Sequence, residues 1–219
     1  MKKLNLNYTI ILLLVLWNLN QTLAQEMKST DGNDWISLFN GKDLDGWKAG
    51  VNASTFSVED GTIKVAGERS HLFYVGDVEN HNFKNFEFKA RVMTKPGSNS
   101  GIYIHTQYQE DGWPLHGYEV QVNNSQGDWK RTGSLYNIVD VKENYAKDNE
   151  WYKEYVKVQG NRIIVKINDI VFVDYTEPEK TFREVDCIYR VIGTGTFALQ
   201  GHDPGSFVFY KDIMVRPLP

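Results

Sequence analysis

The sequence predicts an all-β protein, built as a two-sheet antiparallel sandwich of the jelly-roll type. Short runs in which apolar and polar residues alternate recur along the 219 residues, and no long stretch has the periodicity of a helix. Glycine, asparagine and aspartate separate these runs at short intervals, as tight turns between antiparallel strands require. The chain is also rich in Tyr, Phe, Trp, Val and Ile, the residues that favour strands. About a dozen strands with short connections are typical of one sandwich.

Each expected strand is an alternating run bounded by turn residues. In chain order these strands are residues 35–39, 55–59, 62–66, 71–75, 83–92, 101–107, 117–122, 151–159, 162–167, 170–175, 196–202 and 206–215. Residues 123–132 are predicted to form a polar loop at a sheet edge, and the charged segment 140–150 to hold one helical turn. No repeat or linker divides the chain, so residues 35–219 are predicted to be one jelly-roll domain.

The first 24 residues have the pattern of a secretory signal peptide. Lys2 and Lys3 precede an apolar run at residues 10–17, and Thr22-Leu23-Ala24 supplies a small-residue cleavage end. The apolar run is too short to span a bilayer. We therefore expect an exported protein, periplasmic or extracellular, with no membrane span and a short polar tether at residues 25–34.

Charge and cysteine content exclude other classes of protein. Cleavage after residue 24 would remove two lysines and no acidic residue, which takes the formal net charge from −4 to −6. Nucleic acid is therefore not an expected partner, because binding its phosphates needs a basic face. Cys187 is the only cysteine, so no intramolecular disulfide can form. Its apolar neighbours favour a buried structural thiol over a nucleophile.

The most informative stretch is the pair of expected strands at residues 101–107 and 117–122. Side chains alternate between the two faces of a strand. If the aliphatic faces are buried, four polar side chains share the other face, namely Tyr103, His105, Glu119 and Gln121. An imidazole, a carboxylate, an amide and a phenol on one rigid sheet suit a polyhydroxylated ligand. The alternative is an ordinary solvated sheet face.

Five motifs occur in order along the chain: LFNGKDLDGW at 38–47, NSGIY at 99–103, GYEVQ at 117–121, TGSLY at 132–136 and LQGH at 199–202. Together they resemble the 3-keto-disaccharide hydrolase family over nearly the whole predicted domain. The resemblance implies a concanavalin-like jelly roll in an exported bacterial protein. It also implies a hydrolase that cleaves glycosides already oxidised to a ketone at C3.

The chemistry implied by the resemblance assigns roles to particular residues. A ketone at C3 acidifies the hydrogen on C2, so a base can remove it and the group on C1 can leave before water adds back. Glu119 and His202 are the candidates for proton transfer, with the choice of base left open. Gln121 and Tyr136 are the candidates for hydrogen bonds to the sugar. No second carboxylate stands two or four residues from Glu119, which argues against a retaining glycosidase.

The remaining candidates flank this predicted site. Tyr103 and His105 are expected beside Glu119, and three loop residues are expected to contact sugar rings, namely Trp113, Trp129 and Arg131. His71, His81 and His116 are interpreted as surface or turn residues.

A divalent cation held by His105, Glu119 and His202 is an alternative arrangement for the same site. The chain has no HxH or HExxH motif, so no metal or other cofactor is expected. It also has no nucleotide-binding glycine loop. The 3-keto substrate would therefore come from a separate sugar 3-dehydrogenase, a functional rather than a bound partner.

Two other classes of function compete with the enzyme. This sandwich hosts non-catalytic carbohydrate-binding modules as readily as enzymes. A structural or adhesive envelope domain is the third interpretation, and it predicts no concave pocket. Acid and base groups of shifted pKa on the polar face would favour the enzyme, whereas aromatic stacking platforms alone would favour the binding module.

Overall fold

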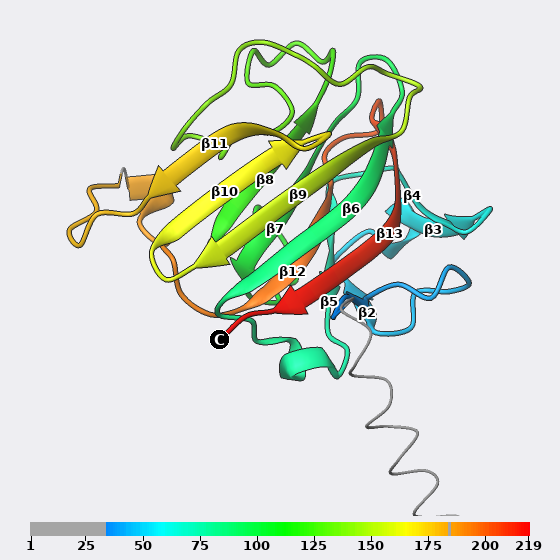
Figure 1. The fold of residues 1–219 in the computed structure, drawn as a ribbon. Coiled ribbons are helices and arrows are strands. Elements are labelled where there is room, and N and C mark those ends of the chain that lie inside the picture. Colours follow the sequence, from blue (N-terminus) through cyan, green and yellow to red (C-terminus); the bar gives the residue numbers. More distant parts are fainter. Residues whose placement is uncertain (1–33, 184) are drawn as a thin grey trace, which may run out of the picture. The chain divides into compact units, whose positions relative to one another are not determined.

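The predicted all-β sandwich is confirmed in the computed structural model, which describes residues 34–183 and 185–219. The unit of residues 36–219 contains two antiparallel sheets, one behind the other in Figure 1. The predicted signal peptide and all of the tether but Asp34 lie outside the described residues. No helix in the described part of the chain has the length and apolar character needed to cross a membrane.

The larger sheet has the strand order β11-β10-β9-β6-β13-β4-β3, and β1 also pairs with β13. Its strands are β1 (Ile36–Ser37), β3 (Phe56–Glu59), β4 (Thr62–Ala66), β6 (Phe86–Thr94), β9 (Tyr152–Gln159), β10 (Arg162–Ile167), β11 (Ile170–Thr176) and β13 (Phe207–Pro217). The smaller sheet has the order β2-β5-β12-β7-β8. Its strands are β2 (Trp47–Ala49), β5 (Ser70–Tyr74), β7 (Asn99–Thr106), β8 (Tyr118–Asn123) and β12 (Thr196–Gly201).

Helical structure is limited to three short 3₁₀ turns in the described residues, η2 (Ala53–Thr55), η3 (Val78–His81) and η4 (Val185–Cys187). The helical turn predicted within residues 140–150 is wrong. Asn144 donates from Nδ2 to the Asn124 carbonyl at 2.6 Å, and the Asn149 N–H donates to the Thr94 carbonyl at 2.8 Å. These contacts with distant segments hold the charged segment in an irregular conformation, which local sequence does not reveal.

The hydrophobic core fills the space between the sheets. Phe86, Phe88, Ala90 and Val92 alternate inward from β6, as predicted, and are at most 1% exposed. Phe197 of the smaller sheet packs on Phe86 and Phe88, with ring centroids 4.9 and 4.7 Å apart. Aromatic contacts of this kind therefore join the two sheets.

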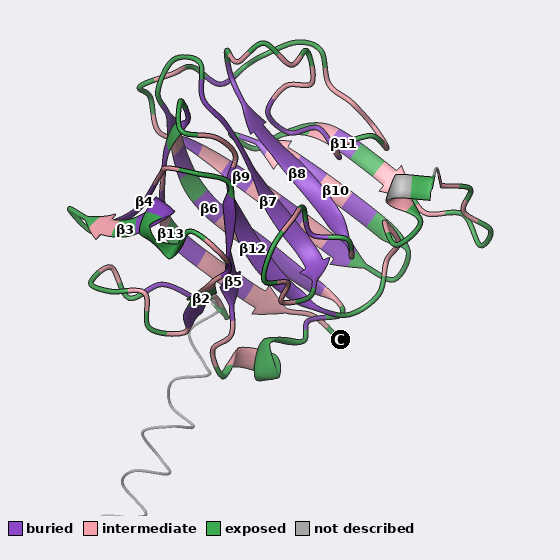
Figure 2. Cartoon of the chain, turned by 180° about the vertical axis from the view of Figure 1, so that it is seen from behind, coloured by how far each residue is buried: buried purple, intermediate pink, exposed green. Residues whose placement is uncertain are grey.

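Four strands of the smaller sheet are buried on both faces. Every residue of β5, β7, β8 and β12 is buried, and these strands form the continuous purple sheet in Figure 2. One face packs on the core. The other face carries polar side chains that loops cover. This arrangement encloses polar groups on a rigid sheet, and it positions the site described below.

Glu154 of β9 is a carboxyl group in the core itself. It is fully buried, and neither carboxyl oxygen has a hydrogen-bond partner among the described residues. Burial raises the pKa of Glu154 well above its ordinary value of 4.5. Glu154 is therefore protonated in the folded protein at a pH where an exposed glutamate is charged.

We predict that Glu154→Gln stabilises the fold increasingly as the pH rises. Below the ordinary pKa of 4.5, both the folded and unfolded wild-type chains are protonated at Glu154. Above it, the unfolded chain releases the proton and the folded chain retains it, so wild-type stability falls until the folded pKa is reached. Each pKa unit of difference contributes about 1.4 kcal/mol. Urea unfolding between about pH 4 and about pH 8 measures the effect.

Glu150→Gln, a change at an exposed glutamate paired with Lys147, is the matched control. It should leave the pH dependence of the free energy of unfolding unchanged. Identical pH dependence for wild type and Glu154→Gln would contradict a protonated core carboxyl.

Candidate functional site

A cavity of about 240 Å³ lies on the loop-covered face of the smaller sheet. Its sheet residues are all polar, namely Asn99, Tyr103, Glu119, Gln121 and Gln200. The remaining lining residues lie outside the strands, namely Trp113, Pro114, Leu115, Asp128, Tyr136, Asn137, Cys187, Arg190 and His202. The cavity is at the small end of ligand pockets and combines a polar floor with partly apolar walls.

Glu119 is the carboxylate at the floor of this cavity. It lies directly opposite Tyr103 in the β7–β8 pair. The Tyr103 hydroxyl donates to Glu119 Oε2 at 3.0 Å, and Gln200 Nε2 donates to Glu119 Oε1 at 2.7 Å. The Arg190 guanidinium stands 3.9 Å from Oε2. Three neighbouring strands and one loop thus converge on a single carboxylate that is 5% exposed.

Burial raises the pKa of Glu119, although the positive charge of Arg190 and the hydrogen bonds from Tyr103 and Gln200 oppose the rise. Desolvation penalises the carboxylate, while each donor stabilises it. A carboxylate with a raised pKa is a stronger base than an exposed one. Perturbed groups of this kind are common at functional sites.

Gly101 makes room for the Glu119 side chain. A Cβ atom at residue 101 would lie 2.5 Å from Glu119 Oε1 and 2.9 Å from its Cγ. No real Cβ approaches another atom so closely, so any larger residue must displace the carboxylate. The glycine of the NSGIY motif therefore has a steric role beneath the acid.

We predict that Gly101→Ala destabilises the protein by about 1–3 kcal/mol, the usual cost of overpacking. The cost should fall sharply in a Glu119→Ala background, because the obstructing carboxyl group is gone. A double-mutant cycle by urea unfolding measures this coupling. Gly127→Ala, where an added Cβ meets nothing within 4 Å, is the neutral control. Additive costs for the two changes would contradict the steric role.

His202 follows β12 and faces the cavity from one side. Its Nδ1 contacts Asp203 Oδ2 at 2.6 Å, so Nε2 is the nitrogen left for a ligand. Burial works against ionisation of Asp203, but hydrogen bonds from His202, Ser206 and the Gly205 N–H hold the pKa of its carboxyl below the ordinary value. The ionised Asp203 fixes the orientation of the imidazole ring through this contact.

His71 corrects a prediction, because it is buried and not a surface residue. It is 3% exposed in β5, and its ring meets the Tyr103 and Trp113 rings edge-on at 5.3 and 5.6 Å. Burial, with the positive charges of Arg69 and His202, lowers the pKa of His71 to about 3. A neutral imidazole therefore supports the ring of Tyr103, which in turn donates to Glu119.

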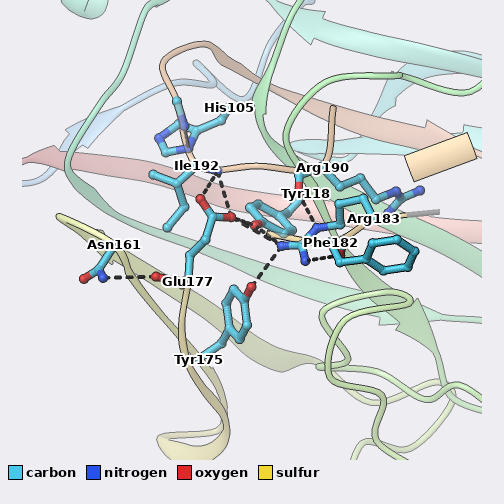
Figure 3. Close-up of polar contacts among 10 residues, drawn as sticks. His105, Tyr118, Asn161, Tyr175, Glu177, Phe182, Arg183, Arg190 and Ile192 are labelled. Carbon is cyan, nitrogen blue, oxygen red and sulfur yellow. Dashed lines mark hydrogen bonds and ion pairs between the residues drawn. The ribbon is translucent and has the colours of Figure 1, made fainter. Parts of the chain in front are cut away.

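Arg190 reaches Glu119 from a segment that a largely buried ion pair anchors. Figure 3 shows this pair, Arg183 and Glu177, close to Arg190. Arg183 Nη2 donates to the Tyr118 and Tyr175 hydroxyls at 3.0 and 2.9 Å and pairs with Glu177 at 3.4 Å. Arg183 Nε donates to the carbonyl of Arg190 at 2.7 Å. The network fixes the backbone that carries the Arg190 guanidinium.

We predict that Arg190→Met raises the pKa of Glu119 further. Removing a positive charge 3.9 Å from the carboxylate removes the strongest influence that lowers this pKa. A carboxyl ¹³C titration of glutamate-labelled protein measures the shift, with Glu119→Gln identifying the resonance. Arg69→Met removes a guanidinium that pairs with Asp111, and serves as the control. An unchanged or lower Glu119 pKa in Arg190→Met would contradict the assignment.

The structure brings six of the nine sequence-predicted residues to the cavity, namely Tyr103, Trp113, Glu119, Gln121, Tyr136 and His202. Gln121 lines the cavity floor and is buried, and its Oε1 has no hydrogen-bond partner among the described residues. Trp113 is 41% exposed and packs against His202, with ring centroids 5.3 Å apart.

His105 lies elsewhere, and its predicted place beside Glu119 is wrong. The pairing of β7 with β12 shifts register near it, and His105 has a φ of 53°. This bulge breaks the alternation of side chains. His105 instead packs edge-on against Phe86 at 5.4 Å and bonds through Nε2 to the Lys84 carbonyl at 2.8 Å. Figure 3 shows it beside Ile192.

Trp129 and Arg131 do not line the cavity either. Arg131 Nη1 donates to the Gln126 carbonyl at 2.7 Å and to Asn123 Oδ1 at 3.1 Å. These hydrogen bonds stabilise the loop that carries Arg131. Trp129 is 49% exposed and contacts the ammonium groups of Lys130 and Lys142. The predicted loop at residues 123–132 is closed by its own hydrogen bonds, and neither side chain is among the residues that line the cavity.

Sequence reasoning missed Gln200 and Arg190 and misplaced Cys187. Gln200 stands two residues before His202 on the same strand, so period-two alternation could have found it. Arg190 has no local signal, because its segment is irregular. Cys187, predicted to be a buried structural thiol, is only partly buried and lines the cavity.

The three-ligand cation arrangement does not form, because His105 points away from Glu119 and His202. Within residues 34–183 and 185–219, no three His, Cys, Asp or Glu side chains lie together as a set of metal ligands. The cavity's polar groups instead suit the hydroxyls and carbonyl of a sugar.

The fold and the cavity define a jelly-roll protein with an enclosed polar site. Residues 34–216 match the model of the 3-keto-alpha-glucoside-1,2-lyase-like domain. The chain therefore belongs to this family, which confirms the resemblance seen in the five motifs. Family membership gives the protein a carbohydrate-related function. A comparison with curated proteins gives no match.

Solved structures with the same fold include two proteins of Parabacteroides distasonis, each provisionally named a glycosyl hydrolase. The first has 22% identity and a TM-score of 0.71, covering 86% of this chain and 98% of its own. The second has 20% identity and a TM-score of 0.65, covering 84% and 99%. The carbohydrate binding module CBM66 of Bacillus subtilis has 12% identity and a TM-score of 0.54, covering 78% and 95%. These likenesses support the jelly-roll fold.

Proposed function

We propose that this protein cleaves 3-keto-glycosides by removing the C2 proton, eliminating the group on C1 and adding water to the product. The observation that carries the proposal is Glu119, a buried carboxylate of raised pKa in a polar cavity that His202 also lines. The family description supports the elimination step, because it names a 1,2-lyase of 3-keto-glucosides.

The first step is proton transfer from C2. The ketone at C3 makes this hydrogen acidic, and the Glu119 carboxylate takes it as general base. The electron pair of the C2–H bond passes into the C3 carbonyl and forms an enolate. Arg190 and Gln121 line the same cavity, and they supply the positive charge and the amide donor that stabilise the enolate oxygen.

The second step expels the group on C1. The electron pair returns from the enolate oxygen, the C1–C2 double bond forms and the C1–O bond breaks. His202 gives a proton from Nε2 to the departing oxygen, and Asp203 holds the imidazole ring in place through its contact with Nδ1. Water then adds at C1 and a proton returns to C2, which releases a 3-keto sugar. No electrons are gained or lost overall.

The proposed reaction needs an external source of oxidised sugar. A sugar 3-dehydrogenase would supply it as a functional partner, and the leader-like pattern of residues 1–24 supports export of this chain. We therefore place the reaction in the periplasm or outside the cell.

The test is release of 3-keto-glucose from 3-keto-trehalose or a 3-keto-glucoside in deuterated water, followed by NMR. Wild type should act on the oxidised sugar alone and introduce deuterium at C2. Glu119→Gln and His202→Ala should each lower kcat by about 10²- to 10⁴-fold, the usual contribution of a general acid or base. Glu150→Gln is a matched surface control and should keep full activity.

Two outcomes would contradict the proposal. Cleavage of the unoxidised sugar would indicate an ordinary glycosidase, for which Asp128, the other carboxylate lining the cavity, is the residue to test. Binding without turnover by a folded protein would indicate a carbohydrate-binding module instead.

A further inference from the structure

One wall of the cavity is apolar and prearranged. Trp113, Pro114 and Leu115 line it, from the loop between β7 and β8, and we name these three residues the apolar wall. Trp113 and Leu115 are 41% and 52% exposed. Large apolar side chains left open at the edge of a polar cavity indicate a contact surface for a ligand.

Side-chain contacts from outside the apolar wall hold it in place. The Gln109 amide donates from Nε2 to the carbonyls of Asp111 and Trp113 at 2.6 and 2.9 Å, and its Oε1 accepts from the Leu115 N–H at 3.3 Å. The loop also joins the Arg190 segment, because the His116 and Tyr189 rings stack at 4.8 Å. The wall is therefore formed before any ligand arrives, which lowers the ordering cost of binding.

The apolar wall begins beside His202, the residue that would protonate the departing oxygen. Trp113 packs against His202, with ring centroids 5.3 Å apart and planes inclined at 40°. His202 is the acid of the proposed elimination. A group bonded to the oxygen that His202 protonates must therefore lie beside the indole of Trp113, with Leu115 further along the wall.

We propose that the apolar wall is the subsite for the leaving group and that the preferred substrates are 3-keto-glycosides of aromatic or other apolar alcohols. This inference rests on the proposed elimination chemistry. The side chains of the wall offer one hydrogen-bonding group, the indole N–H of Trp113. A second sugar would bring several hydroxyl groups to a wall with almost no partners for them, whereas a benzyl-sized group would bury apolar surface.

The test compares 3-keto benzyl glucoside with 3-keto methyl glucoside and a 3-keto disaccharide linked through a primary hydroxyl. All three leaving groups are primary alcohols or methanol, so a difference in rate reports binding rather than leaving-group acidity. Wild type should show a kcat/KM for the benzyl glycoside at least about tenfold above that for the methyl glycoside. The disaccharide should resemble the methyl glycoside.

Variants then locate the preference. Leu115→Ala should reduce the benzyl-to-methyl ratio by about three- to tenfold, mainly through a higher KM for the benzyl glycoside. Trp113→Ala should lower the ratio further and also slow both substrates, because Trp113 touches His202. Ile170→Ala, at an exposed residue of β11 with 56% exposure, is the matched control and should preserve the ratio.

The outcomes separate this inference from the function on which it rests. Turnover of all three substrates with no benzyl preference would overturn the apolar subsite and leave the elimination chemistry standing. Absence of turnover would overturn the chemistry. Calorimetry with Glu119→Gln then tests the apolar wall independently of turnover. Equal Kd values for 3-keto benzyl glucoside and 3-keto methyl glucoside would overturn the apolar subsite. Binding of the benzyl compound that is tighter by about tenfold or more would support it.

Discussion

The burial of one carboxylate, that of Glu119, is the constraint on which the site depends. A carboxylate without water must be stabilised by fixed donors. The protein supplies a phenol from β7, an amide from β12 and a guanidinium from the Arg183-anchored segment. Gly101 supplies the space. These partners come from positions far apart in the chain, so only the native fold assembles them around the buried Glu119.

Glu154 shows how burial changes the pKa of a glutamate that lacks such partners. Both glutamates are buried, but Glu154 lies on the core side of the larger sheet with no partner for either oxygen among the described residues. Burial alone then drives its pKa well above the ordinary value. Glu119 has four opposing influences, and its pKa is raised less strongly. The pKa values of the two buried glutamates therefore differ because only Glu119 has hydrogen-bond donors and a positive charge beside it.

The two faces of the smaller sheet differ in composition and in what covers them. One face packs against the aromatic core and provides rigidity, while the other holds polar side chains beneath loops. The jelly roll itself does not decide function, since a carbohydrate binding module of Bacillus subtilis has the same fold. What this chain adds is the set of titratable groups, Glu119 and the His202–Asp203 pair, on a preformed surface.

The all-β class and most of the strands could be predicted from the sequence, because alternation and turn chemistry are local properties. The family could be predicted because the five motifs occur in order along the chain. The sequence also placed Glu119, Tyr103 and Gln121 on one face, since β7 and β8 pair in regular register up to Ile104. Tertiary contacts set the positions of the residues that the sequence misplaced or missed, namely His71, His105, Trp129, Arg131 and Arg190. A bulge turned His105 against Phe86, hydrogen bonds within its own loop hold Arg131, and a largely buried ion pair anchors the segment that carries Arg190. Register shifts and loop paths follow from contacts between residues distant in sequence, and no local pattern encodes those contacts.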